Sequence, residues 1–296
     1  MLNFQTFKIW LLAARPKTLW AAIAPVLMGT ALAANDRAFH WPSAFVALIG
    51  AILIQIGTNY ANDYFDFLKG ADAGKRLGPT RATQAGQVQP QQMRLAFILV
   101  FALAMLLGIY LVWRGGWPVV AIGLASIFFG VLYTATPYAL AYLGIADLFV
   151  LVFFGPVAVG GTYYVQTLTI EPYILIAGLA PGLISMAILV VNNLRDIETD
   201  RAAGKKTLAV RFGKQFTQAE YILCLLAACL ISLWLSIAHD LPIALGIVFL
   251  ILPAGISSIK TVFNPGEGVI LNRVLAGTGK LLLLYCVLFS AALLLG

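Results

Sequence analysis

Apolar runs long enough to cross a lipid bilayer recur along the whole length of this chain. A helix needs about 20 mostly apolar residues to cross the roughly 30 Å of hydrocarbon in a bilayer. Only 10% of the residues are charged, against roughly 25% in soluble domains, and 61% are hydrophobic. The sequence therefore predicts an all-α, polytopic membrane bundle that forms a single domain over residues 1–296.

Nine of these runs are long enough to be read as membrane spans. They cover Thr18–Ala34, Trp41–Ala61, Arg94–Trp113, Trp117–Tyr133, Gly144–Val165, Pro172–Asn192, Phe216–Ala238, Pro242–Phe263 and Leu275–Leu295. We expect nine transmembrane helices around a central cavity, with the longer loops forming a cap on the cytoplasmic side.

The distribution of basic residues predicts how the chain is oriented. If the N-terminus is cytoplasmic, 16 of the 19 lysine and arginine residues fall in inside segments, whereas the outside loops hold only Arg37 and Arg114. An excess of this kind is typical of cytoplasmic loops. We therefore expect a multi-pass protein of the cell membrane with a cytoplasmic N-terminus. The net charge of +7 follows from this topology and does not call for a nucleic-acid partner.

Acidic residues gather in two short stretches, each opened by an asparagine at the end of an apolar span. The first runs from Asn59 to Asp66 and the second from Asn192 to Asp200. These stretches, with Asp72, hold six of the 12 acidic residues in the chain. A carboxylate costs about 2.5–3.5 kcal/mol at the centre of a membrane helix and less near its ends, so such residues usually mark a functional site. The alternative is a pair of solvated helix ends that carry acidic residues by chance.

The spacing within each stretch predicts a surface suited to a divalent cation. At 100° per residue, Asn59, Asp63 and Asp66 fall within about 60° around a helix. Asn192, Asp196 and Asp200 likewise fall within about 80°. Carboxylate and amide oxygens are the ligands that Mg²⁺ and Ca²⁺ prefer. We expect these six residues to bind metal and the four aspartates to be catalytic.

Each acidic stretch leads into a long basic loop on the predicted cytoplasmic side, over residues 62–93 and 193–215. The two asparagine-led stretches are offset by 133 residues, which indicates two related halves facing one another across a cavity. Carboxylates, nearby cations and an apolar cavity together suit a polyprenyl diphosphate, whose charge Arg and Lys neutralise as pyrophosphate departs.

The basic residues nearest the acidic stretches are the candidate contacts of that diphosphate. Besides Asn59 and Asn192, they are Lys17, Arg81, Arg195, Lys205 and Lys206. Each of these cations is equally well explained as a positive-inside residue or, for Lys17, as a snorkelling lysine. Asp147 is a further candidate for binding an aromatic substrate, although compensation of a helix N-terminus explains it about as well.

Several motifs resemble the UbiA superfamily of membrane prenyltransferases over essentially the full chain. They are Arg15-Pro-Lys-Thr-Leu19, the stretch from Asn59 to Asp66, Lys69-Gly-Ala-Asp72, Gly78-Pro-Thr-Arg81, Val152-Phe-Phe-Gly155, and the run from Asn192 through Gly204-Lys-Lys-Thr207 to Gly213. The two residues between Asp63 and Asp66 look like the 1,4-dihydroxy-2-naphthoate branch. The 4-hydroxybenzoate and haem O branches typically have three.

The resemblance implies a fold, a reaction and a cofactor. It implies nine spans and two Mg²⁺ ions held by Asp63, Asp66, Asp196 and Asp200, with Asn59 and Asn192 supporting. It also implies that a polyprenyl group replaces the carboxylate of 1,4-dihydroxy-2-naphthoate, with loss of CO₂ and pyrophosphate, to give demethylmenaquinone.

Three alternatives stay open on sequence grounds. One is a prenyltransferase of the same superfamily acting on another aromatic acceptor, such as 4-hydroxybenzoate. Another is a secondary transporter, although transporter sites lie near the membrane midplane and these acidic residues lie at the ends of spans. The last is a CDP-alcohol phosphotransferase, although the single long aspartate motif of those enzymes is missing from the chain.

Overall fold

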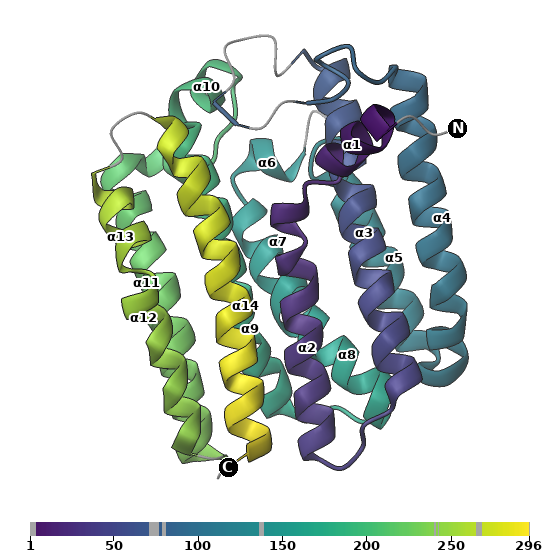
Figure 1. Ribbon diagram of the computed structural model, residues 1–296, viewed down its shortest axis with the longest axis vertical. Coiled ribbons are helices and arrows are strands. Elements are labelled where there is room, and N and C mark those ends of the chain that lie inside the picture. Colours follow the sequence, from purple (N-terminus) through teal and green to yellow (C-terminus); the bar gives the residue numbers. More distant parts are fainter. Residues whose placement is uncertain are drawn as a thin grey trace.

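The computed structural model describes residues 4–70, 77–78, 81–135, 139–239, 241, 243–264 and 268–295, and all regular structure within these ranges is helical (Figure 1). The longer helices are α1 (Phe4–Ala13), α2 (Trp20–Asn35), α3 (Trp41–Leu68), α4 (Pro90–Gly115), α5 (Trp117–Leu132), α8 (Ala158–Thr167), α9 (Pro172–Arg195), α11 (Leu208–Ala238), α13 (Ile256–Phe263) and α14 (Leu271–Leu295). The short elements are η1 (Pro16–Thr18), α6 (Leu140–Leu143), α7 (Ala146–Val152), η2 (Phe153–Val157), α10 (Ile197–Ala202), η3 (Ile243–Leu250), α12 (Ile251–Ala254) and η4 (Gly268–Ile270).

Each of the nine predicted apolar runs coincides with helical structure. Among the described residues, six helices are long and apolar enough to cross a membrane, and the number rises to eight if each of two bent pairs is one span. The bends are 53° between α1–η1 and α2, and 51° between the η3–α12 segment and α13. The remaining run, α5, is a shorter apolar helix. The chain is therefore a multi-pass helical membrane protein.

Proline and polar caps fix where several of these helices begin. Proline occupies one of the first two positions of α3, α4, α5 and α9. Its missing N–H group costs nothing there, since the first turn has no intrahelical partner for it. The His40 ring also accepts a hydrogen bond from the Ser43 backbone N–H group and so caps α3.

Helix α9 lies at the centre of the bundle and α4 at its edge. The most apolar stretch of α9 is 67% buried inside the protein, against 11% for α4, so α4 presents most of its surface to lipid. Helix α9 packs against α11, α14, α7 and η2, while α3 packs against α4 and α2 against α14.

Glycines allow α9 to approach the broken helix opposite it. A Cβ atom added at Gly182 would lie 2.4 Å from the Leu151 backbone oxygen, and one at Gly155 would lie 2.6 Å from the Gly178 oxygen. Small residues allow this kind of close backbone contact between membrane helices. On the opposing side, Gly155 and Pro156 interrupt the helix in a short π-helical turn, η2, between α7 and α8. Such turns often occur at functional sites.

Helices α1, α6 and α10 lie at one end of the bundle, where α3 and α9 also end (Figure 1). Both acidic stretches therefore lie at the same end of the protein, as the sequence predicted. Asp72 and the neighbouring Lys75 and Arg76 lie outside the described residues.

Candidate active site

A cavity of about 1040 Å³ lies within the bundle, and both acidic stretches contribute to its wall. Polar side chains line one end, from α3 on one side and from α9 and α10 on the other. Most of the remaining wall comes from apolar residues of α2, α3, α4, α5 and α8. The cavity therefore joins a charged end to a long apolar space.

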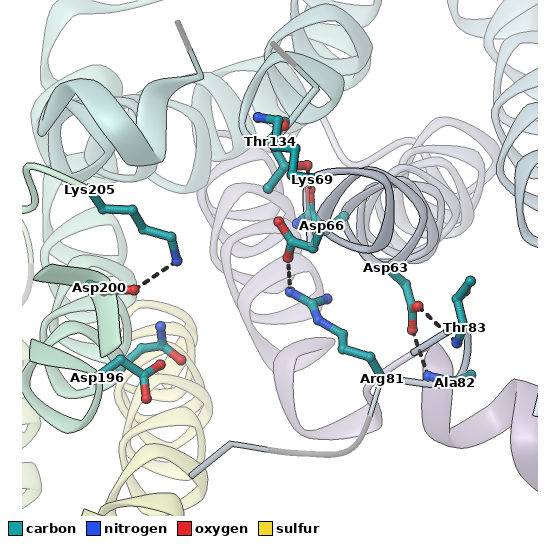
Figure 2. Close-up of polar contacts among 12 residues, drawn as sticks. Asp63, Asp66, Lys69, Arg81, Ala82, Thr83, Thr134, Asp196, Asp200 and Lys205 are labelled. Atoms are coloured by element: carbon teal, nitrogen blue, oxygen red, sulfur yellow. Dashed lines mark hydrogen bonds and ion pairs between the residues drawn. The ribbon is translucent and has the colours of Figure 1, made fainter. Parts of the chain in front are cut away.

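The first polar wall is formed by one face of α3. Asn59, Asn62 and Asp66 line the cavity, and all three are buried. The Asp66 carboxylate forms an ion pair and hydrogen bond with Arg81, which the loop before α4 brings to the same wall (Figure 2). Asn62 accepts a hydrogen bond of 2.8 Å from the Thr134 hydroxyl.

Asp63 has a different role from its neighbours in this structure. Its carboxylate accepts hydrogen bonds from the backbone N–H groups of Ala82 at 2.9 Å and Thr83 at 3.1 Å, and it does not line the cavity. Figure 2 shows the side chain directed at this loop, on the far side of Arg81 from Asp196 and Asp200. Asp63 thereby holds the loop that presents Arg81 to Asp66. In this structure the carboxylate is engaged by this tertiary contact with the loop, and metal ligation by Asp63 stays a prediction.

The second polar wall does not continue as one helix, in contrast to the expected face through Asn192, Asp196 and Asp200. Helix α9 ends at Arg195, and Asp196 has φ −101° and ψ 10°, which separates α9 from α10. All three predicted residues still line the cavity. Because of this break, the angular positions of the three residues differ from those on a single continuous helix.

Arg195 is a buried link within this wall rather than a side chain of the cavity. Its guanidinium donates to both oxygens of Asp196, at 2.8 and 2.5 Å, and to Asn192 Oδ1 at 2.8 Å. It also donates to Asn272 Oδ1 at 2.7 Å, and Asn272 in turn donates to the Leu77 backbone oxygen at 2.8 Å. Arg195 thus fixes Asp196 and Asn192 and ties them to α14 and to the loop of the first half.

Asp200 and Lys205 form the second ion pair that lines the cavity, at 2.7 Å. Burial raises the pKa of the Asp200 carboxyl, and Lys205 opposes that rise. Burial lowers the pKa of Lys205, but Asp200 more than offsets this effect and holds the pKa above its ordinary value. The two side chains form a partly buried salt bridge.

Lysines from the two halves meet over one aromatic ring. Lys69 Nζ lies 4.8 Å from the centre of the Tyr142 ring, and Lys205 Nζ lies 5.9 Å from it. Lys69 also donates to the backbone oxygen of Thr134. Burial lowers its pKa, and the Asp66 carboxylate opposes that effect. Two ammonium groups beside the same ring make this part of the wall suitable for binding a polyanion.

The predicted cations are therefore divided between cavity and surroundings. Arg81 and Lys205 line the cavity, whereas Lys17 and Lys206 are exposed and do not. Glu198 is also exposed and pairs with Arg201 at 3.0 Å. The explanation of Lys17 as a snorkelling lysine fits the structure, because its side chain is exposed on η1.

Sequence reasoning missed several polar residues of the cavity wall, among them Arg15, Asn62 and Lys69. Asn62 and Lys69 precede and follow Asp66 by four and three residues, which is the spacing of neighbours on one helix face. That signal was present in the sequence. Arg15 lies in the cavity wall because the chain turns at η1, and the sequence alone does not predict that turn.

The donors of the two walls fit a metal that is shared with a phosphate ligand. Among the described residues there is no group of three or more His, Cys, Asp or Glu side chains close enough to hold a metal ion. Mg²⁺ is usually bound by one or two carboxylates together with substrate phosphates, not by an all-protein cage. Asp66 on one wall, and Asp196 and Asp200 on the other, match that pattern of few carboxylates. In this structure a cation neutralises each of the three.

Comparison with known proteins gives a family and several relatives of similar length. The sequence model of the UbiA prenyltransferase family matches residues 22–268. The chain is 34% identical over 304 residues to the 1,4-dihydroxy-2-naphthoate octaprenyltransferase of Haemophilus influenzae, with 100% of this chain and 98% of that protein covered. It is 38% identical over 287 residues to the protein of that name from Escherichia coli, covering 95% and 93%. A UbiA homolog from Archaeoglobus fulgidus, solved bound to GPP and Mg²⁺, has a TM-score of 0.63 at 17% identity, covering 96% and 99%.

Replacing Asp63 tests its role as the anchor of the Arg81 loop. In Asp63→Ala the backbone N–H groups of Ala82 and Thr83 lose their acceptor, so we expect these amides to exchange with deuterium about tenfold faster. Asp200→Ala removes a similarly buried carboxylate from the opposite wall and should leave this exchange unchanged. Unchanged exchange in Asp63→Ala would show that the loop is held by other contacts.

Proposed function

The chain belongs to the UbiA prenyltransferase family, and we propose that it transfers a polyprenyl group from a polyprenyl diphosphate to 1,4-dihydroxy-2-naphthoate. One observation carries this proposal: two polar walls with carboxylates and cations meet at one end of a largely apolar cavity. A prenyl diphosphate has the same division, with a polyanionic head and a hydrocarbon tail. Relatives that match nearly the whole chain are named for this acceptor.

The proposed cofactor is Mg²⁺, as two ions held between the diphosphate and the walls. We assign Asp66, Asp196 and Asp200 as carboxylate ligands, with Asn59, Asn62 and Asn192 supporting. Support comes from their position in the cavity wall and from the UbiA homologue solved with GPP and Mg²⁺. When bound, Mg²⁺ supplies Lewis-acid polarisation of the diphosphate oxygens. We assign Asp63 to the support of Arg81.

The cations of the walls would exchange partners when substrate binds. Arg81 and Lys205 are each paired with a carboxylate, and Lys69 lies beside both walls. Metal binding to Asp66 and Asp200 would free these cations to contact the diphosphate. They would then stabilise the charge that builds on pyrophosphate as the allylic C–O bond breaks, because a preorganised donor is most effective where charge develops.

The proposed reaction balances without an oxidant or a net proton transfer. The allylic C–O bond breaks and its electron pair leaves with pyrophosphate. The ring's π electrons form the new bond to the allylic carbon. The ring carboxylate then leaves as CO₂, and the electrons of that C–C bond restore the aromatic ring. The product is a prenylated 1,4-naphthoquinol, the reduced form of demethylmenaquinone.

We further propose that the active site faces the cytoplasm of a plasma membrane and that nine spans cross it. The clustering of 16 of 19 basic residues in segments on the same side as the N-terminus supports the orientation. The two bent helix pairs and α5, added to the six long helices, support the count. The loops and short helices at the site end would form the cytoplasmic cap.

An assay with purified protein tests the acceptor. Given a polyprenyl diphosphate, Mg²⁺ and 1,4-dihydroxy-2-naphthoate, the protein should release CO₂ and pyrophosphate in equal amounts. EDTA should stop both releases together, because departure of pyrophosphate precedes bond formation. With 4-hydroxybenzoate the product would keep its carboxylate, and kcat/KM should be lower. A higher kcat/KM with 4-hydroxybenzoate would refute the naphthoate assignment.

The apolar space predicts where a long tail lies. Gly123 lines the cavity in α5, and nothing lies within 4 Å of the position that a Cβ atom would take. It is ten residues before Tyr133, which is about 15 Å along a helix, too far for a two-unit geranyl tail to reach from the charged end. Gly123→Leu should raise the KM for a long polyprenyl diphosphate about tenfold and leave that for geranyl diphosphate unchanged.

Gly123→Ala is the matched control, since its single methyl group leaves most of the space open. Equal effects of Gly123→Leu on long and short diphosphates would place the tail elsewhere in the cavity.

A further inference from the structure

Asp147 is a buried carboxylate in the cavity wall that the proposed chemistry of the diphosphate does not use. The residue is 5% exposed and lies at the second position of α7. Among the described residues, neither of its side-chain oxygens accepts a hydrogen bond from another residue. Only the backbone N–H group of Asp147 itself lies close to the carboxylate. An unpartnered buried carboxylate costs free energy, so its presence beside a cavity indicates a binding role.

Three aromatic side chains line the same cavity as Asp147, and one of them, Phe149, follows it by two residues in α7. The Phe129 ring centre lies 4.7 Å from that of Phe149 and 5.4 Å from that of Phe153. Phe149 and Phe153 are close to parallel, at an interplanar angle of 7°. All three line the cavity. A flat aromatic ligand can stack in such a wall, since offset and edge contacts between rings are favourable.

Tyr133 links this wall to the charged end of the cavity. It packs with Phe129 and Phe149 around the buried Leu140 and Ala146. Tyr133 also lies within electrostatic range of Asp147, Asp200 and Asp66. The aromatic wall is therefore adjacent to the proposed diphosphate site, where an acceptor ring must lie to meet the allylic carbon.

We propose that this wall is the acceptor subsite and that Asp147 accepts a hydrogen bond from a ring hydroxyl of the phenolic substrate. The inference rests on the proposed function and extends it by naming the subsite. A carboxylate accepts from a hydroxyl group and repels another carboxylate. Asp147 would therefore orient the ring with a hydroxyl toward α7 and with its carboxylate toward the cations of the charged end. The hydroxyl proton stays on the ring throughout.

A structural role at the helix N-terminus predicts a different outcome for the same substitution. If Asp147 stabilised the start of α7, its removal would lower the melting temperature of the protein. Among the residues that the structure describes, no other residue donates a backbone hydrogen bond to the Asp147 side chain, and Ile145 caps this helix without a side-chain bond. We therefore expect Asp147→Asn to melt at the same temperature as the wild type or higher.

The experiment compares the kinetics of Asp147→Asn with those of Glu220→Gln. Glu220 lies within electrostatic range of Asp147 but does not line the cavity, so it is a matched neutralisation of a nearby carboxylate. In Asp147→Asn we expect the KM for 1,4-dihydroxy-2-naphthoate to rise tenfold or more, because a charge-assisted hydrogen bond is weakened. The KM for the polyprenyl diphosphate should stay within twofold. Glu220→Gln should change neither value.

Competitive inhibition by acceptor analogues provides a second measurement. The two naphthoates that each lack one ring hydroxyl are compared in wild type and Asp147→Asn. The analogue that lacks the hydroxyl bound by Asp147 should inhibit both proteins equally, whereas the other should inhibit Asp147→Asn about tenfold less well.

Two results would overturn the subsite. One is an unchanged acceptor KM in Asp147→Asn. The other is an equal rise in the KM of both substrates. If the wild type prefers another phenolic acceptor, the naphthoate assignment fails and the same comparison is made with that acceptor, for which the tenfold rise is still expected. Failure of the wild type to prenylate any phenol would refute both proposals.

Discussion

Pairing between carboxylates, most of them buried, and cations holds the charged end of the cavity together. Asp66, Asp196 and Asp200 are each neutralised, by Arg81, Arg195 and Lys205 respectively. A lone charge in such a buried position is costly, and loss of one partner from a buried pair typically costs about 3–5 kcal/mol. The pairs therefore keep an apolar bundle folded around groups that a diphosphate and its metal ions can later engage.

The packing of the bundle places the aromatic wall beside the charged end of the cavity. Close packing at Gly155, Gly178 and Gly182 brings the broken helix against α9, and the break at η2 lies near the aromatic wall. Asp147 and the aromatic rings thereby lie beside the polar walls. A secondary transporter would place its polar residues near the middle of the spans. Here they gather where α3 and α9 end, with the apolar space extending from them, which favours a reaction at a bound head group.

The sequence predicted those parts of the structure that depend on local composition. Each predicted apolar run coincides with helical structure, because hydrocarbon length and helical rise are fixed quantities. The asparagine and aspartate stretches identified both walls. Asn62 and Asp63 show the limit of this reasoning: they are adjacent in sequence, yet one lines the cavity and the other binds the loop at Ala82. Angular spacing on a helix cannot decide between them, since the loop contact is tertiary.

Tertiary contacts also explain the other differences between the sequence predictions and the structure. The angles predicted a continuous helix through Asp196, whereas the bonds from Arg195, itself tied to α14 through Asn272, accompany a break there. Charge patterning alone did not distinguish the exposed Lys17 from Arg15 in the cavity. In each case the outcome depends on contacts between segments far apart in the chain.

Metal binding measured with and without a diphosphate tests the central claim, that the two walls form one metal site only when a prenyl diphosphate lies between them. Mn²⁺ can replace Mg²⁺ as the probe, and paramagnetic resonance reports the free ion. The wild type should bind Mn²⁺ weakly alone and at least tenfold more tightly with an unreactive thiolo analogue of geranyl diphosphate. Asp66→Asn and Asp196→Asn, one on each wall, should each remove that gain. Tight binding without the analogue, or an undiminished gain in either variant, would contradict the account.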